Sequence, residues 1–404
     1  MGWSRSVAGA GAAPLLLASL LAACDGGAVA GAGHTVADSA GVRIVVSERP
    51  VWGAEPVRLD TAPIVRIGSD EPGPYLFSFI GTGLLFPDGR IGVTEMSANE
   101  VRLFSKEGKH LGSMGRRGRG PGEYQLLSGV FPYGVDSLIT YDQMLRRTMV
   151  VTPAGGVGRV VANPLPGNLF AFGALEGENL LLYNPGSFRR DAPPGLQWDT
   201  TEVARFDLSS GTGRVIAQLP SRQRFYEDGG NTRPLSPAHI AVFAASSHGF
   251  YWAASDRYEI RFFDGEGNLE RILRRQVEPQ SVEPAMIDRW VAVNLDDARR
   301  REGEAAVPRY RTLLEAGMRG DRVPLFQQAF VDRDDRLWMG ESAWPESQTA
   351  SRRWSIFGVD GVWLGDLEVP SGFRVLDCRG NLVLGVWPDE DGVPRVQVHA
   401  MVQP

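Results

Sequence analysis

Residues 80–115 read IGTGLLFPDGRIGVTEMSANEVRLFSKEGKHLGSMG. The turn sequences Pro87-Asp88-Gly89 and Glu107-Gly108 separate short apolar runs and supply the positive φ angles that tight hairpins need. The runs fit strands because each is short and is bounded by Gly, Pro or charged residues. This stretch therefore predicts a unit of four antiparallel strands, at residues 83–86, 91–94, 100–104 and 110–114.

A similar unit recurs along the chain. Further copies begin near Leu127, Asn168, Ala238, Leu325 and Gly372, at intervals of more than 40 residues. Four-stranded units at this spacing are typical of a propeller, so the predicted fold is all-β, a six-bladed β-propeller. The last copy supplies three strands, and Pro63–Gly68 is expected to add the fourth and close the ring. A pair of β-sandwiches is the alternative fold.

The repeat also resembles a known family. Three segments, Phe86–Ile91, Val101–Phe104 and Gly115–Tyr124, are similar to six-bladed propellers of the NHL-repeat type, and specifically to bacterial envelope lipoproteins with that fold. The resemblance covers roughly residues 60–402. It implies a fold and a place in the cell, but no reaction, because many members of the group have no assigned activity.

Composition excludes several classes of protein. The 404 residues carry 42 Lys and Arg against 48 Asp and Glu, which gives a net charge of −6. This acidic balance argues against a nucleic-acid partner, which would need a basic surface. Hydrophobic residues make up 43% of the chain, enough to bury a sizeable core. The chain has two cysteines, too few for a disulfide scaffold.

Residues 1–23 are predicted to be a secretory signal peptide. Arg5 precedes a nearly uncharged stretch rich in Ala, Gly and Leu. The following Leu21-Ala22-Ala23-Cys24 resembles the bacterial lipobox, which implies that Cys24 is the lipid attachment site. An ordinary signal peptide beside an unrelated Cys24 is the alternative.

The predicted domain organisation follows from this leader. Residues 24–40 are expected to form a lipidated flexible tether, and residues 41–404 a single propeller. The expected location is the bacterial cell envelope, exported and held on a membrane by the lipid, in the periplasm or on the outer surface. Cys378 lies in an apolar run and is expected to be a buried, inert thiol.

Long connections are predicted to gather at one face of the propeller. The turns between first and second strands, and between third and fourth strands, are short. The insertions fall in the other loops and in the links between units, at 115–125, 184–201, 221–237, 276–324 and 342–352. Because loops on a rigid scaffold often carry binding residues, this insertion-rich face is the expected recognition surface.

The insertion at residues 276–324 is expected to be helical. Apolar residues such as Met286, Trp290 and Leu295 recur at helical spacing, with Ser281 as the N-cap and Pro284 in the first turn. The apolar stripe is expected to pack on the propeller beside or over the channel mouth. This contact could be plain packing or a lid.

Polar residues at the ends of the second strands are candidate ligands. Those expected at the rim of the central channel are Glu95, Asp142, Asn184, Asp256, Glu341 and Asp389. Carboxylate oxygens suit a divalent cation such as Ca²⁺ as a cofactor, or a basic ligand. The alternative is that they cap loops and strands and need no ligand.

Two further candidates carry positive charge or a titratable ring. Arg116, Arg117 and Arg119 lie in a Gly-rich link, where guanidinium and backbone N–H groups could hold an anion; a solvated turn is the alternative. His239 is the histidine expected nearest the channel.

The favoured function is a non-catalytic binding or scaffolding propeller. It would recognise a peptide, a glycan or an envelope protein through the insertion-rich face, since the chain has no His-x-x-x-His, Cys-x-x-Cys, Gly-x-Ser-x-Gly or P-loop motif. The alternative is a metal-dependent hydrolase or lyase, similar to gluconolactonase, with carboxylates at the channel mouth.

Overall fold

The computed structural model describes residues 29–31, 33–152, 156–185, 191–345 and 351–402. The unit predicted from residues 80–115 is present as an antiparallel four-stranded sheet. Its strands are β6 (Ile80–Leu85), β7 (Ile91–Glu95), β8 (Glu100–Phe104) and β9 (His110–Met114). The turns between them contain Gly89 and Gly108, with φ of 87° and 84°, so the glycines serve the purpose predicted for them.

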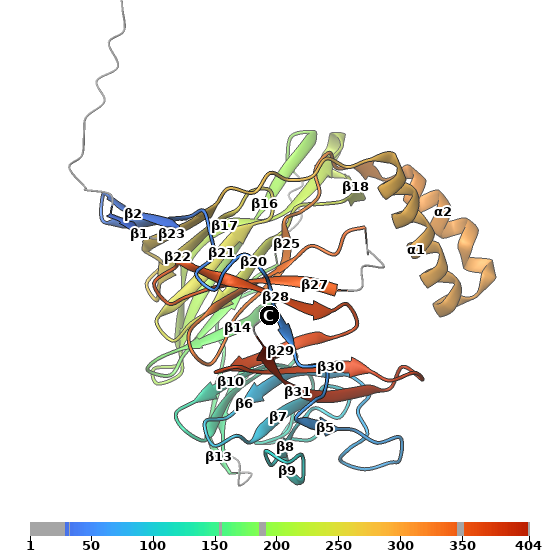
Figure 1. The fold of residues 1–404 in the computed structure, drawn as a ribbon. Helices are drawn as coiled ribbons and strands as arrows, with labels where there is room; N and C mark the ends of the chain where they lie inside the picture. The colour runs from blue at the N-terminus through green and yellow to red at the C-terminus, as the bar shows by residue number, and fades with distance from the viewer. Residues whose placement is uncertain (1–28, 32, 153–155, 186–190, 346–350, 403–404) are drawn as a thin grey trace, which may run out of the picture.

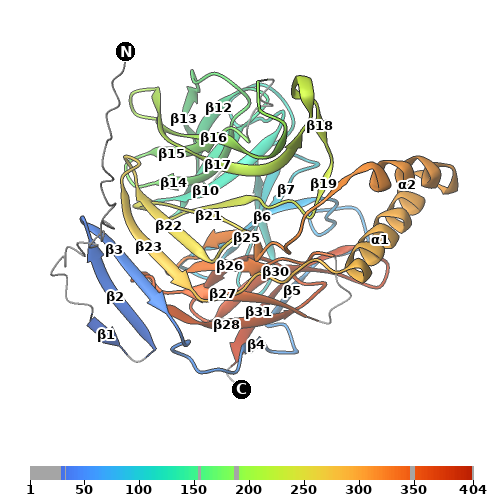
Figure 2. The same cartoon turned by 90° about the horizontal axis from the view of Figure 1, so that it is seen from above.

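Similar antiparallel meanders follow around a common centre (Figures 1 and 2). The next three are β10 (Leu127–Tyr133), β11 (Ser137–Asp142), β12 (Arg147–Val151) and β13 (Val157–Ala162); β14 (Phe170–Leu175), β15 (Asn179–Tyr183), β16 (Gly195–Asp207) and β17 (Thr212–Tyr226); and β20 (Ala241–Ala245), β21 (Gly249–Ala254), β22 (Glu259–Asp264) and β23 (Leu269–Arg275). The fold is therefore all-β and propeller-like.

The prediction of six separate blades is wrong, because the strands of the last two predicted blades belong to one sheet. Its strands are β25 (Phe326–Val331), β26 (Leu337–Glu341), β27 (Ser351–Phe357), β28 (Trp363–Pro370), β29 (Arg374–Arg379), β30 (Leu382–Pro388) and β31 (Pro394–Val402). The short strand β4 (Val57–Leu59) pairs in parallel with β28 and antiparallel with β31. One nine-stranded sheet results, because β4 joins the outer strands of two meanders that the sequence predicts as separate blades.

The strand expected to close the ring is present. β5 (Val65–Ile67) pairs antiparallel with β31, with Ile67 opposite Val396 and Val65 opposite Val398. Val65 and Ile67 pack in one apolar cluster with residues of the first meander, such as Phe104, and with β31. This strand thus ties the N-terminal part of the chain to the last meander and covers an exposed sheet edge.

The N-terminal segment differs from the flexible tether expected at residues 24–40. Strands β1 (Val29–Gly31), β2 (His34–Ser39) and β3 (Val42–Ser47) extend the sheet of β20–β23, and β3 pairs in parallel with β23. Backbone pairing with β3 therefore holds residues 34–39 in a sheet. The predicted signal peptide and Cys24 lie outside the described residues, and within those residues no helix is long and apolar enough to cross a membrane.

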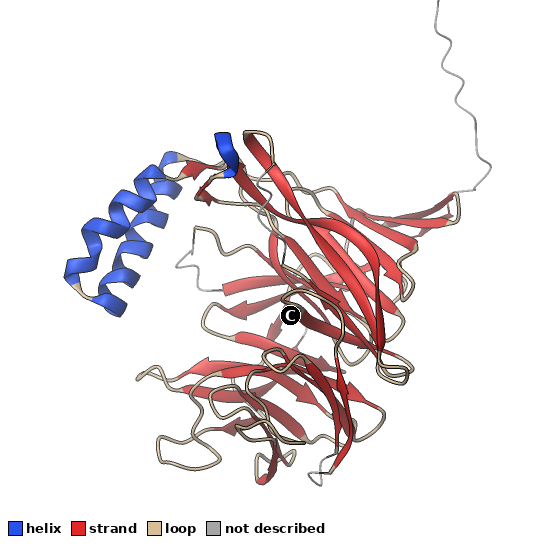
Figure 3. Ribbon diagram, turned by 180° about the vertical axis from the view of Figure 1, so that it is seen from behind, coloured by secondary structure: helices blue, strands red, loops and turns tan. Residues whose placement is uncertain are grey.

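The helical insertion exists but packs differently from the prediction. It holds α1 (Pro284–Glu302), the 3₁₀ turn η2 (Glu304–Ala306) and α2 (Val307–Ala316), and Glu283, not Ser281, is the N-cap. The helices contact each other and project from the strands, as Figures 1 and 3 show. Leu295 and Ala298 of α1 and Val307 of α2 are buried within a hairpin that stands away from the strands, so the expected packing of the apolar stripe on the propeller is wrong.

A small parallel sheet anchors this helical hairpin. β24 (Met318–Arg319) pairs with β19 (Leu235–Ser236), close to η1 (Asp228–Gly230) and β18 (Thr232–Arg233). The guanidinium of Arg319 lies 5.4 Å from the ring centre of Trp290 on α1. The hairpin is therefore joined to the body at its base.

The strand directions define two ends of the molecule. We call the end where second strands finish and first strands begin the insertion end, and the opposite end the turn end. The link at residues 115–125, the far tips of β16 and β17, and the helical hairpin all belong to the insertion end. First strands contact one another around the centre: β6 with β10 and β29, β14 with β10 and β20, and β20 with β25. They surround the channel that holds the candidate site.

Candidate functional site

Glu95 and Asp142 act as internal caps. Glu95 is 2% exposed, and its carboxylate accepts hydrogen bonds from the backbone N–H groups of Ser78 and Phe79 at 3.0 and 3.1 Å. Asp142 is fully buried and accepts from the N–H of Gln125 at 2.8 Å. Each carboxylate ties the end of a second strand to the chain that enters the first strand of the same meander. Backbone donors thus occupy both side chains.

Asn184 and Asp389 also bond locally. The hydroxyl of Thr201 donates to the backbone oxygen of Asn184. Asp389 begins the turn between β30 and β31 and accepts a hydrogen bond from Arg395 Nε at 2.8 Å. Both residues therefore stabilise their own hairpins.

Asp256 and Glu341 lie in different surroundings from these caps. Asp256 Oδ1 is buried without a hydrogen-bond partner among the described residues. Glu341 lines a separate cavity of about 260 Å³ with Arg353 and Glu368, and burial raises the pKa of Glu341. In the described part of the chain no three His, Cys, Asp or Glu side chains come together to hold a metal ion. The carboxylates expected to form a ring do not converge on one cation site.

The hairpin turn after β25 contains three acidic residues, Asp332, Asp334 and Asp335. Asp332 accepts from the backbone N–H groups of Asp334 and Arg336, both at 2.9 Å, and from Arg336 Nε at 2.7 Å. The group is therefore a turn held by its own backbone. Cys378 is buried nearby, and burial raises the pKa of its thiol.

The Gly-rich link at 115–125 contains its own anion. The carboxylate of Glu123 accepts from the N–H groups of Gly120 at 2.8 Å and Arg119 at 2.9 Å, and from Arg116 Nε at 2.9 Å. The hydrogen bond from Gly120, with those from Arg116 and Arg119, lowers the pKa of Glu123. Arg117 is exposed on the same link. The chain thus supplies the negative charge for which the sequence suggested an external ligand.

His239 packs behind the channel wall. It is 7% exposed, its Nδ1 lies 3.5 Å from Ser255 Oγ, and burial lowers its pKa. Ser255 Oγ is also the acceptor for the N–H of Ile240. The neighbouring Ile240 and Ala241 line the channel cavity, whereas His239 is not among its lining residues.

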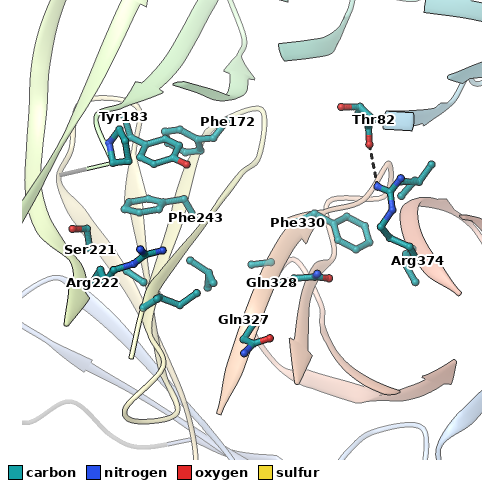
Figure 4. Close-up of a pocket in the computed structure, with 18 of the residues that line it drawn as sticks. Thr82, Phe172, Tyr183, Ser221, Arg222, Phe243, Gln327, Gln328, Phe330 and Arg374 are labelled. Carbon is teal, nitrogen blue, oxygen red and sulfur yellow. Dashed lines mark hydrogen bonds between the residues drawn. The ribbon is translucent and has the colours of Figure 1, made fainter. Parts of the chain in front are cut away.

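A cavity of about 710 Å³ opens at the insertion end of the channel (Figure 4). Strands of several meanders build its walls, so it is formed by the fold and not by one loop. Its aromatic and polar lining side chains are Thr82, Phe172, Tyr183, Ser221, Arg222, Arg224, Phe243, Gln327, Gln328, Phe330, Trp354 and Arg374. None of the described residues that line it is Asp, Glu, His, Cys or Lys.

A second cavity of about 420 Å³ continues the channel toward the turn end. It shares Thr82, Phe172, Phe243 and Phe330 with the first cavity. These residues therefore lie between the two halves of the channel. The second half is lined by acids as well as bases, such as Asp335.

Aromatic rings form one wall of the insertion-end cavity. The rings of Tyr183 and Phe243 stack with centres 5.3 Å apart and planes 19° apart. Phe172 meets Tyr183 edge to face at 5.8 Å. All three are half-buried, so part of each ring faces the cavity (Figure 4). Burial raises the pKa of Tyr183, and the charge of Arg222 opposes that rise, which places Arg222 near the same wall.

The opposite wall carries amides and a second arginine. Gln327 and Gln328 are exposed, and Arg374 lies on the same side of the cavity (Figure 4). Arg374 donates to the backbone oxygens of Ile80 at 2.8 Å and Gly81 at 3.2 Å. These bonds link β29 to β6 and hold the guanidinium in place.

The cavity was not predicted from the sequence, because the residues predicted at the channel rim are those at the ends of the second strands. The lining comes largely from first strands, which read as plain apolar runs. Their alternation is broken by register shifts, for example between Phe326 and Gln328 and between Val375 and Asp377. Gln327-Gln328 and Arg374, polar residues at the start of two first strands, were the available signal.

Comparisons with known proteins give only distant likenesses. No protein-family model and no curated protein matches the chain. A Bacteroides fragilis protein described as exported is 10% identical over 89% of this chain and 100% of its own, with a TM-score of 0.49. A DUF4221 family member from Bacteroides vulgatus is 11% identical over 86% and 98%, with a TM-score of 0.47. A Xanthomonas campestris gluconolactonase is 12% identical over 86% and 98%, with a TM-score of 0.42. Likenesses of this strength carry no information about a ligand or a reaction.

Proposed function

We propose that this chain is an exported, membrane-anchored protein of the bacterial envelope that binds a ligand in the insertion-end cavity without converting it. The carrying observation is the cavity itself, about 710 Å³ and walled by aromatic rings with a few polar groups. Ligand sites in proteins are typically concave, largely apolar and of this size. The ligand is a peptide, a glycan or part of an envelope protein.

The chemistry of the lining supports binding over catalysis. General acid–base catalysis needs a carboxylate, imidazole or similar group within reach of the substrate. The described lining residues offer guanidinium, amide and hydroxyl groups instead, and burial raises the pKa of the one phenol among them, that of Tyr183, which makes it a weaker acid. The hydroxyl of Ser221 donates to the backbone oxygen of Asp199 at 3.3 Å and has no histidine beside it among the lining residues.

A panel of defined oligosaccharides and peptides tests the proposal. Trp354, one of ten tryptophans, lines the cavity, so a change in the tryptophan fluorescence of the purified full chain is the signal for binding. At least one member should bind saturably and be recovered unchanged by mass spectrometry. Tyr183→Ala should abolish binding, whereas Phe79→Ala, which removes a ring that is 60% exposed on the surface, should not. Conversion of a bound compound, or binding that survives Tyr183→Ala, would contradict the proposal.

The anchor is tested separately. The leader and Leu21-Ala22-Ala23-Cys24 support lipidation at Cys24, and acyl methylenes contribute about 0.8 kcal/mol each when buried in a membrane. We expect Cys24→Ser to move the protein from the membrane fraction to the soluble fraction. Cys378→Ser serves as the control, because that thiol is buried in the fold. Equal membrane retention of both variants would refute lipidation at Cys24.

A further inference from the structure

The insertion-end cavity holds positive charge that the described protein does not neutralise. Three arginines line it, and Arg224 pairs with the fully buried Asp199. The guanidinium of Arg222 has no hydrogen-bond or ion-pair partner among the described residues, and its backbone pairs with Ile240. Arg374 bonds only to backbone oxygens within the same described set. Two guanidinium groups thus face the cavity without a carboxylate.

Arg374 is open to the cavity, although the protein around it disfavours its charge. Burial lowers the pKa of Arg374, whereas acidic partners such as Asp332 raise the pKa of Arg336 despite burial. Arg222 and Arg374 are both exposed to the open cavity, so an entering anion can reach them, and a charge-assisted hydrogen bond there is stronger than one between neutral groups. The planar fork of a guanidinium matches a carboxylate with two parallel hydrogen bonds.

The aromatic and glutamine residues of the lining indicate which kind of anion would fit the cavity. The stacked rings of Tyr183 and Phe243 make the wall apolar on the side of Arg222. Gln327 and Gln328 offer amide donors and acceptors across from it (Figure 4). A sugar ring uses both walls, since its C–H face packs on an aromatic ring while its hydroxyls bond to amides. A bare inorganic anion would use neither.

We propose that the cavity binds an acidic oligosaccharide of carboxylated sugars, such as hexuronate units, with Arg222 directed at one carboxylate and Arg374, on the opposite wall, at another. This inference rests on the proposed binding function and names the class of its ligand. A sugar ring lies against Tyr183 and Phe243, and the glutamines bind its hydroxyls. The chain would therefore recognise acidic glycan ends at the envelope.

Calorimetric titration of the full chain with trigalacturonate and with oligomers of glucuronate and mannuronate tests the inference. At least one of these should bind, and more weakly as salt is added. Its methyl ester, which keeps the ring and removes the charge, should not bind. Arg222→Gln and Arg374→Gln should each weaken binding by about 10- to 100-fold, the range expected for a charged hydrogen bond. Arg43→Gln, at an exposed position on the outer strand β3, should leave affinity unchanged.

The outcomes separate this inference from the proposed function. Equal binding of acid and ester, or unchanged affinity in Arg222→Gln, would overturn the inference. So would binding of neutral sugars or peptides from the panel without any uronate, although the proposed function would then stand. Arg374→Gln also removes the bonds to Ile80 and Gly81, so its melting temperature is measured first. Arg222→Gln loses no such described bond and keeps the test valid if Arg374→Gln is unstable.

Discussion

The buried side chain of His239 is expected to make the stability of the protein depend on pH. Burial lowers its pKa from the ordinary 6.5, although Asp256 acts in the opposite direction. In the unfolded chain the imidazole of His239 therefore becomes protonated near pH 6.5, whereas in the folded chain it stays neutral to a lower pH. The free energy of unfolding should be at its full value above that pH and should fall as the pH drops through it. We expect His239→Gln to flatten this slope in urea titrations between pH 8 and pH 5, whereas His248→Gln, at an exposed turn, keeps it. Identical slopes in wild type and His239→Gln would contradict the assignment.

At this scale the sequence predicts the position of a polar residue better than it predicts the group to which that residue hydrogen-bonds. The sequence correctly marks Glu95 and Asp142 as strand-end acids, but their partners are backbone N–H groups brought near by the fold. Glu123 lies within a few residues of Arg116, yet only the turn in the link shows that the two bond. Arg222 and Arg374 come from strands far apart in the chain, so no local pattern places them in one cavity.

At the scale of elements, the helical hairpin should be separable from the strands. Its helices contact each other, and the two arms of the insertion pair at its base, where Val282 N–H donates to Asp321 O at 2.9 Å. Replacing residues 284–316 by a short Gly-Ser linker should therefore change the free energy of unfolding by less than about 1 kcal/mol. It should also leave panel binding intact, because no residue of α1 or α2 lines the cavity. A variant that unfolds, or one that loses ligand binding, would show that the hairpin supports the body or covers the site.

Elements were predicted well where local chemistry defines them. Asp-Gly and Glu-Gly turns mark the meander of β6–β9, and the spacing of apolar residues marks α1. β4 was missed because its three residues have no periodicity, and its partners β28 and β31 lie more than 300 residues away in sequence. The packing partner of each helix was also not predicted. An apolar stripe indicates that one face of a helix is buried, but it does not indicate which element covers that face.

At the scale of the whole molecule, closure of the ring by β5 should control cooperative unfolding. Ile67 is 1% exposed and packs between the first meander and β31, whereas Ile64, three residues earlier, is 59% exposed. Ile67→Asp buries a charge in that apolar cluster, so it should lower the free energy of unfolding by roughly 3 kcal/mol or more. Ile64→Asp makes the same chemical change at the surface and should cost less than about 0.5 kcal/mol. Meanders contact mainly their neighbours, so opening the ring should also broaden the urea transition of Ile67→Asp, as local units begin to unfold separately. If both variants unfold at the same urea concentration as wild type, and as sharply, then β5 does not hold the first meander and β31 together.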